Sequence, residues 1–232
     1  MDLSIKRILK DVKMLRSGNL ESLGIYYKHN EDNIYNIKVL MIGPNDTPYN
    51  YGYYLFNITF PPNYPFSPPS VKYYTQGEQI RFNPNLYTNG KVCLSLLNTW
   101  NGPQWSSCNS LLSILISMQS MILIKNPIIN EPGYENDTSE HALKYTQIIE
   151  YSNYNIAICK MINETPSKFI YFKDIMIENF KKNYINIIID INKLIEKYLD
   201  NSNNVNCKIY AMCINTDFKM VLDNINLLHS IC

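Results

Sequence analysis

Residues 81 to 95 read Arg81-Phe82-Asn83-Pro84-Asn85-Leu86-Tyr87-Thr88-Asn89-Gly90-Lys91-Val92-Cys93-Leu94-Ser95, and the rest of the chain is organised around them. A proline fixes the backbone beside Asn85, and a single cysteine follows eight residues later in an apolar step. A thiolate is a nucleophile for acyl groups, and an amide N–H can stabilise an oxyanion. Local features alone leave two interpretations open: a reactive cysteine, or a buried cysteine beside a turn-forming asparagine.

The segment before this loop predicts an α+β fold. Apolar residues recur at helical spacing over residues 4–17, and Gly18 ends that helix. Four strands are expected, at about residues 22–28, 34–42, 51–60 and 71–75. The third alternates apolar and polar residues as a half-buried strand does. Short turn-rich loops and no intervening helix favour an antiparallel meander.

A proline-rich segment separates the third and fourth strands. It reads Pro61-Pro62-Asn63-Tyr64-Pro65-Phe66-Ser67-Pro68-Pro69. Such a segment cannot form a helix or a central strand, so we expect a stiff extended connector. Phe66 is expected to be exposed on it, which makes a binding edge the alternative to a plain connector.

The segment after the loop is expected to be helical. A buried helix is predicted over 110–124, a constrained loop over 128–134 and a further helix over 139–161. Thr165-Pro166 is the best domain boundary, which divides the chain into a core of residues 1–165 and an extension of residues 166–232. The extension is predicted to form helices at 167–182, 184–199 and 217–230, with a loop at 201–204. It is expected to dock through Phe169, Ile170, Phe172, Ile175 and Ile177.

Composition narrows the function classes. The chain carries 21 basic and 20 acidic residues, so it has no charge excess for nucleic acid. The longest apolar run, residues 111–124, is too short to span a membrane. No apolar signal segment opens the sequence, so we expect an intracellular protein, cytoplasmic with the nucleus as a second location. Six unpaired cysteines are expected to be reduced core residues, and three distant histidines give no zinc pattern.

Several motifs in order resemble the ubiquitin-conjugating enzymes. Tyr64-Pro65-Phe66-Ser67-Pro68-Pro69 matches the Tyr-Pro-Phe-x-Pro-Pro segment of that family, and Asn83-Pro84-Asn85 matches its His-Pro-Asn motif with Asn in place of His. Cys93 stands at the expected offset after Asn85. Trp105-Ser106 and the helix through Met118-Gln119-Ser120 continue the resemblance. The fold implied is the ubiquitin-conjugating fold: an N-terminal helix, a four-stranded meander, the active-cysteine loop and packed helices.

Further motifs are similar to those of the Z-type ubiquitin-conjugating enzyme and its larger relatives. These are Arg81 to Asn85, Gly90 to Ser95, the insertion Thr99-Trp100-Asn101-Gly102-Pro103, and Asn130-Glu131-Pro132-Gly133-Tyr134-Glu135. The Z-type enzyme also carries a helical C-terminal extension of similar length. The Asn at position 83 is shared with that group, so it points to a subfamily rather than to lost activity.

The resemblance implies roles for three residues. Cys93 would accept the C-terminal carboxyl of ubiquitin, or of a ubiquitin-like modifier, as a thioester. Asn85 would hydrogen-bond the oxyanion or hold the loop in shape while a lysine amine attacks. Glu131 would orient or deprotonate that amine, with a purely structural role in the Pro132-Gly133 turn as the alternative. No bound cofactor is implied, because the partner activating enzyme uses the ATP.

The resemblance also implies partners. The basic face of the first helix (Lys6, Arg7, Lys10 and Lys13) would dock the activating enzyme, and the region of Phe66, Ser107 and Cys108 would meet a ubiquitin ligase. Many family members read Trp-Ser-Pro-Ala where this chain reads Trp105-Ser106-Ser107-Cys108, which puts ordinary ligase pairing in question. Protein substrates are expected, and neither nucleic acid nor membrane.

Two rival functions stay open at this point. One is a catalytically silent adaptor on the ubiquitin-conjugating fold, against which the retention of both Asn85 and Cys93 argues. The other is a cysteine hydrolase, which needs a histidine base. Only His141 is placed to serve as that base, which weakens the hydrolase hypothesis.

Overall fold

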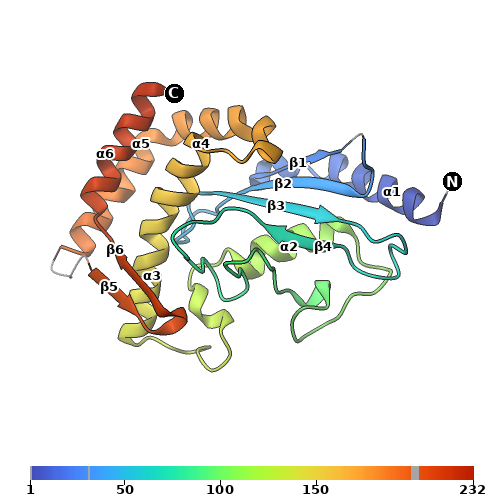
Figure 1. Cartoon of the computed structure of the whole chain (residues 1–232), viewed down its shortest axis with the longest axis horizontal. Helices are drawn as coiled ribbons and strands as arrows, with labels where there is room; N and C mark the ends of the chain where they lie inside the picture. Colours follow the sequence, from blue (N-terminus) through green and yellow to red (C-terminus); the bar gives the residue numbers. More distant parts are fainter. Residues whose placement is uncertain (1, 31, 200–203) are drawn as a thin grey trace.

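A four-stranded antiparallel sheet forms the centre of the protein (Figure 1). The computed structural model describes residues 2–30, 32–199 and 204–232. The sheet has the order β1-β2-β3-β4, which confirms the predicted meander. Its strands are β1 (Ile25–His29), β2 (Asn36–Ile42), β3 (Tyr53–Thr59) and β4 (Ser70–Tyr73). The α+β class predicted from the sequence is therefore confirmed.

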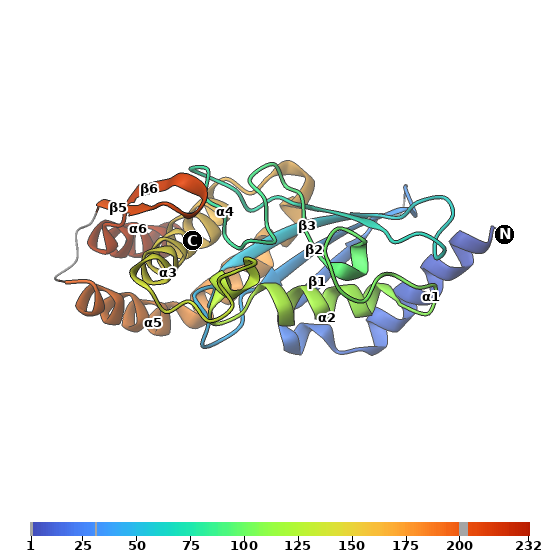
Figure 2. The same cartoon turned by 90° about the horizontal axis from the view of Figure 1, so that it is seen from below.

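One face of the sheet packs on the first two helices, α1 (Leu3–Ser17) and α2 (Leu111–Ile122), which lie on the same side of it (Figure 2). Alternate residues of the central strands point into this core, as period-two side chains must. They include Val39, Tyr54 and Phe56, all buried. Gly18 caps α1 as predicted. The α2 helix is less completely buried than expected, since Ile116 and Met121 are exposed.

The other face of the sheet is covered by the C-terminal part of the chain. Leu40, Tyr53 and Leu55, the residues that alternate with the inner set, pack with Phe169 and Phe180. The prediction that the third strand is half-buried is therefore wrong for most of its length. Only Asn57 and Thr59, at its far end, reach solvent, because the extension ends its cover before them.

The extension differs from the prediction in its helices. It begins with a 3-10 segment over Ser167–Phe172 and continues as one helix, α5 (Lys173–Lys197), where two helices were predicted. Asn183 stays helical at the expected break, and its side chain donates to the Asn179 carbonyl at 2.8 Å. The last helix, α6 (Phe218–Ile231), packs beside α5 (Figure 1).

The extension also contains a two-stranded antiparallel sheet that the sequence did not predict. Its strands are β5 (Asn204–Cys207) and β6 (Met212–Asn215), and β5 packs against α3 (Glu140–Ser152). The predicted loop at 201–204 lies outside the described residues except for Asn204, which begins β5. After α3, the predicted helix over 139–161 continues as a π-helix (Asn153–Lys160) and a short α4 (Met161–Asn163).

Docking of the extension follows the predicted apolar residues with one correction. Phe169 and Phe172 are buried, and Ile175 and Ile177 pack against the same core. Ile170 is 53% exposed, because the 3-10 segment turns it away from the sheet. Along the described ranges, no helix is both long and apolar enough to cross a bilayer.

Candidate active site

The cysteine loop, residues 81–95, doubles back on itself. Leu86 and Val92 form an antiparallel bridge, which brings the two arms together. As a result the Cys93 N–H donates to the Asn85 carbonyl at 2.9 Å. The chain folds back on itself within the eight residues that separate Asn85 from Cys93. This places the two residues side by side.

Cys93 is a free thiol whose residue is only 1% exposed. The strand around it is fixed by Thr99, whose hydroxyl accepts from the Leu94 N–H at 2.9 Å and donates to the Val92 carbonyl at 3.0 Å. Thr99 is the first residue of the insertion at residues 99–103. Cys93 itself is therefore almost entirely covered by its neighbours.

Asn85 borders a pocket of about 210 Å³, which Cys93 itself does not line. The asparagine is 6% exposed, and its side-chain oxygen has no hydrogen-bond partner among the described residues. Buried polar atoms in native proteins are nearly always paired, so an unpaired one needs a ligand or a function. Ser95 and Leu94, which follow the cysteine, line the same pocket. That oxygen can only accept a hydrogen bond, so the side-chain N–H groups of Asn85 are the ones that could donate to an oxyanion.

Asn83 replaces the usual family histidine and anchors the loop. Its Oδ1 accepts from the Asn85 N–H at 2.8 Å and from the Asn130 side chain at 3.2 Å. Its Nδ2 donates to the Ile122 carbonyl at 2.9 Å and faces the Tyr49 hydroxyl at 3.3 Å. The residue is fully buried and its hydrogen-bonding groups are occupied. A neutral amide therefore serves here as the structural anchor.

Glu131 does not line the pocket beside Cys93. Its carboxylate accepts a hydrogen bond from the hydroxyl of Tyr210, a residue of the extension. Its neighbour Asn130 does line the pocket. The catalytic role predicted for Glu131 stays a prediction, and in this structure the side chain has a different partner.

Glu135 is the carboxylate that lines the pocket, together with Asn85 and Asn130. Hydrogen bonds from its own backbone N–H and from the Gly133 N–H, the latter at 3.1 Å, lower the pKa of its carboxyl. A lowered pKa keeps it ionised at neutral pH. Glu135 stands in the Asn130–Glu135 motif of the sequence, but no role was predicted for it. Nothing in the local pattern distinguishes it from Glu131, because the turn between them decides which side chain faces the pocket.

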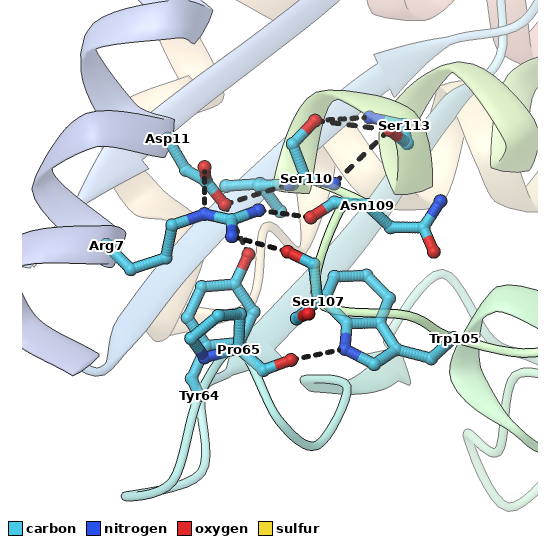
Figure 3. Close-up of polar contacts among 10 residues, drawn as sticks. Arg7, Asp11, Tyr64, Pro65, Trp105, Ser107, Asn109, Ser110 and Ser113 are labelled. Carbon is cyan, nitrogen blue, oxygen red and sulfur yellow. Dashed lines mark hydrogen bonds and ion pairs between the residues drawn. The ribbon is translucent and has the colours of Figure 1, made fainter. Parts of the chain in front are cut away.

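The basic residues of α1 are of two kinds: exposed lysines, and an arginine whose side chain is bound by other residues. Lys6, Lys10 and Lys13 are exposed. Arg7 instead pairs with buried Asp11 at 3.0 Å and donates to the carbonyls of Ser107, at 2.7 Å, and of Asn109 (Figure 3). Its guanidinium therefore ties α1 to the loop before α2.

The loop before α2 is tied to the proline-rich segment as well. The Trp105 indole N–H donates to the Pro65 carbonyl at 2.7 Å (Figure 3). Phe66 is 70% exposed, as predicted, and Ser107 and Cys108 are exposed as well.

The exposure of Cys108 and of Cys213 corrects the expectation that every cysteine is a core residue. Cys93, Cys159 and Cys207 are buried, as expected, whereas Cys232 is half-buried. In the part of the chain that the structure describes, no three His, Cys, Asp or Glu side chains gather as metal ligands.

Comparison with protein families now adds a decisive observation: the model of the ubiquitin-conjugating enzyme family matches residues 7–152, more than half of the chain. The chain belongs to the ubiquitin-conjugating enzyme family. The matched range includes most of α1, the sheet, the cysteine loop, α2 and α3. It ends at the last residue of α3, so the π-helix and the extension lie beyond it.

Individual relatives point to the Z-type branch of the family. The human ubiquitin-conjugating enzyme E2 Z is 48% identical over 128 residues, which are 54% of this chain and 36% of that protein. A Caenorhabditis elegans "Probable ubiquitin-conjugating enzyme protein 17" is 40% identical over 182 residues, which are 74% of this chain and 25% of its own length. This chain thus spans well under half of these curated relatives. A Toxoplasma gondii ubiquitin-conjugating enzyme structure matches with a TM-score of 0.50 and 25% identity, over 66% of this chain and 97% of that one.

Proposed function

We propose that this chain carries ubiquitin, or a ubiquitin-like modifier, as a thioester on Cys93 and passes it to a lysine amine of a target protein. The observation that carries this proposal is the folded-back loop, in which the Cys93 N–H donates to the Asn85 carbonyl and Asn85 borders a pocket. Family membership supports the same chemistry, since the family is named for it.

The first step would be a thioester exchange. The Cys93 sulfur attacks the modifier's C-terminal carbonyl, which arrives as a thioester on an activating enzyme. A new carbon–sulfur bond forms, the old one breaks, and the donor cysteine leaves as a thiolate. ATP is consumed earlier, by the activating enzyme. Exposed Lys6, Lys10 and Lys13 are proposed to dock that enzyme, whereas Arg7 supports the fold through its three contacts.

The second step would be transfer to an amine. The lysine nitrogen attacks the thioester carbonyl, a carbon–nitrogen bond forms, Cys93 leaves as a thiolate, and the amine loses a proton. Free lysine has a pKa near ~10.4, so a nearby carboxylate helps to orient or deprotonate it. Glu135, ionised and lining the pocket, is suited to orienting the amine, and Glu131 was the residue predicted to orient or deprotonate it. The amide of Asn85 would stabilise the oxyanion or shape the loop.

A charging assay tests the proposal. The protein is incubated with ATP, ubiquitin and a panel of activating enzymes, and the panel is repeated with ubiquitin-like modifiers. We expect an adduct that a thiol reductant removes and that Cys93→Ala abolishes. Cys93→Ser should trap a reductant-resistant oxyester. Failure to form any adduct across the whole panel would contradict the proposal, and modifier binding without an adduct would favour the silent-adaptor alternative.

Transfer is then measured as loss of the adduct to free lysine. Glu135→Gln and Glu131→Gln separate the two carboxylates, because each removes a charge and keeps the side-chain shape. The carboxylate that meets the amine should slow transfer at neutral pH without slowing charging. Equal rates for both variants and the wild type would exclude either carboxylate from that role.

A further inference from the structure

The tip of the C-terminal hairpin reaches the cysteine loop. β5 and β6 are joined by a turn over Ile209–Ala211 with Tyr210 at its centre. Tyr210 and Ala211 both have left-handed backbone angles, with φ of 62° and 51°. Such angles are costly for residues other than glycine, and they persist where surrounding contacts fix them.

The hydroxyl of Tyr210 makes the first connection. It donates to the Glu131 carboxylate. The next residue back, Asn130, donates to Asn83 at 3.2 Å, and Asn83 accepts from the Asn85 N–H at 2.8 Å. Burial, and then the Glu131 hydrogen bond, raise the pKa of Tyr210, so its hydroxyl remains a donor throughout the physiological range. This route links the extension to the backbone of Asn85.

The ring of Tyr210 makes the second connection. The Arg81 guanidinium lies 4.0 Å from the centre of that ring and 3.7 Å from the centre of the Tyr87 ring, so it is stacked between them. The same guanidinium donates to the Pro84 carbonyl at 2.6 Å. A cation between two aromatic faces is held firmly where it is partly desolvated. This route reaches the residue immediately before Asn85.

Both routes start at one side chain of the extension and meet at Asn85. We propose that Tyr210 is a positioning residue for acyl transfer at Cys93: it fixes the backbone of Asn85 from two sides. This inference rests on the proposed function. Tyr210 does not line the pocket beside Cys93, so it acts through Arg81 and Glu131 rather than on the amine.

The hairpin is itself anchored well enough to serve this purpose. Val205, Cys207, Ile209 and Met212 are buried in the same core as α3 and the sheet. Tyr145, on α3, supports the same place, since its hydroxyl donates to the Arg81 carbonyl at 2.8 Å and its ring meets Tyr210 edge-on. The tip therefore has a rigid base from which to hold the loop.

The test compares Tyr210→Phe and Tyr210→Ala in the full chain. Tyr184→Ala is the matched control, because Tyr184 also stacks on a side chain, His229, and donates to another, Asn226, far from the cysteine loop in the contact network. Loading of Cys93 is measured first, and single-turnover transfer to free lysine second. We expect loading within about twofold of wild type for all variants. Transfer should slow about tenfold in Tyr210→Ala and about threefold in Tyr210→Phe, with the KM for lysine unchanged.

A double-mutant cycle separates positioning from general stability. If the hydroxyl acts through Glu131, Tyr210→Phe should cause no further loss in a Glu131→Ala background. Additive losses, or transfer rates for both Tyr210 variants equal to that of Tyr184→Ala, would overturn the inference while leaving the proposed function intact. A wild-type protein that forms no thioester would instead overturn the proposed function, and this inference with it.

Discussion

The two faces of the central sheet are buried by different parts of the chain. The inner face packs on α1 and α2, within the range that matches the family. The outer face, through Leu40, Tyr53 and Leu55, packs on residues of the extension. Each face contains aromatic residues with less than 2% exposure, although Asn57 and Thr59 of the outer face reach solvent. The extension is therefore a second part of the sheet's core rather than an appended arm.

Removal of residues 166–232 should have the largest effect on this arrangement. It deletes Phe169, Phe172, Met176 and Phe180, all buried against the sheet or its neighbours. Each such side chain contributes about 1.5–3 kcal/mol on burial, and a whole domain is stable by only about 5–15 kcal/mol. We expect the truncated chain to aggregate or to lack a cooperative unfolding transition. Circular dichroism during urea titration measures this, and wild-type stability of the fragment would show that the two faces are independent.

A single cavity on either face of the sheet should lower the free energy of unfolding by a similar amount. Phe56→Ala opens the inner core and Phe180→Ala opens the outer one; both residues are at most 1% exposed. Each should lower the free energy of unfolding by about 3–5 kcal/mol. Urea unfolding followed by fluorescence and by circular dichroism should give one shared transition in each variant. Separate transitions in Phe180→Ala would mean that the extension unfolds alone.

Two buried tyrosine hydroxyls offer a finer test of the same comparison. Tyr49 donates to the Phe82 carbonyl at 2.7 Å on the inner side, and Tyr53 donates to the Met176 carbonyl at 2.8 Å on the outer side. Tyr49→Phe and Tyr53→Phe should each cost about 1 kcal/mol, because each leaves a carbonyl without this donor. Urea midpoints measure both. No loss in Tyr53→Phe would argue that the outer contact is dispensable.

The smallest expected effect is on the reactivity of the individual cysteine thiols. Exposed Cys108 and Cys213 should react with a maleimide within minutes at neutral pH, whereas Cys159 and Cys207 should not. Burial raises the pKa of Cys159 to about 12 and also raises that of Cys207. A raised thiol pKa means that the stabilising contribution of Cys159 is present at neutral pH and is lost as the pH rises from about 9 towards about 12. Cys108→Ser and Cys213→Ser should each remove one fast-reacting thiol by mass spectrometry; fast labelling of Cys159 would contradict the burial.

The inner half of the fold could be predicted because its signals are local. Helical spacing in residues 4–17, strand alternation around Phe56 and the turn residues between strands each specify one element. The outer half could be predicted only in part: Phe169 and Phe172 were expected to dock, but Leu40 and Leu55 look like any strand residues until a distant segment covers them. The hairpin was missed because its strands, Asn204–Cys207 and Met212–Asn215, carry few of the β-branched and aromatic residues that mark a strand.

The site divides in the same way. The eight-residue spacing of Asn85 and Cys93 is a local property, and the structure explains it as a folded-back loop. The contact between Glu131 and Tyr210 joins residues that are 79 apart in the sequence. No sequence pattern near either residue predicts it. The choice between Glu131 and Glu135 at the pocket depends on a turn geometry that residue types alone do not settle.

The cover of the outer face also bears on how the chain folds. Tyr53 meets Met176 across 123 residues, and Asn50 meets Asp190 across 140. Contacts between such distant residues form late in folding, because closing the long intervening segment into a loop first costs conformational entropy. The meander and its inner helices can therefore assemble first, with Leu40, Tyr53 and Leu55 still in water. A transient intermediate whose inner sheet face is buried and whose outer face is still exposed to solvent is the species most prone to self-association during folding.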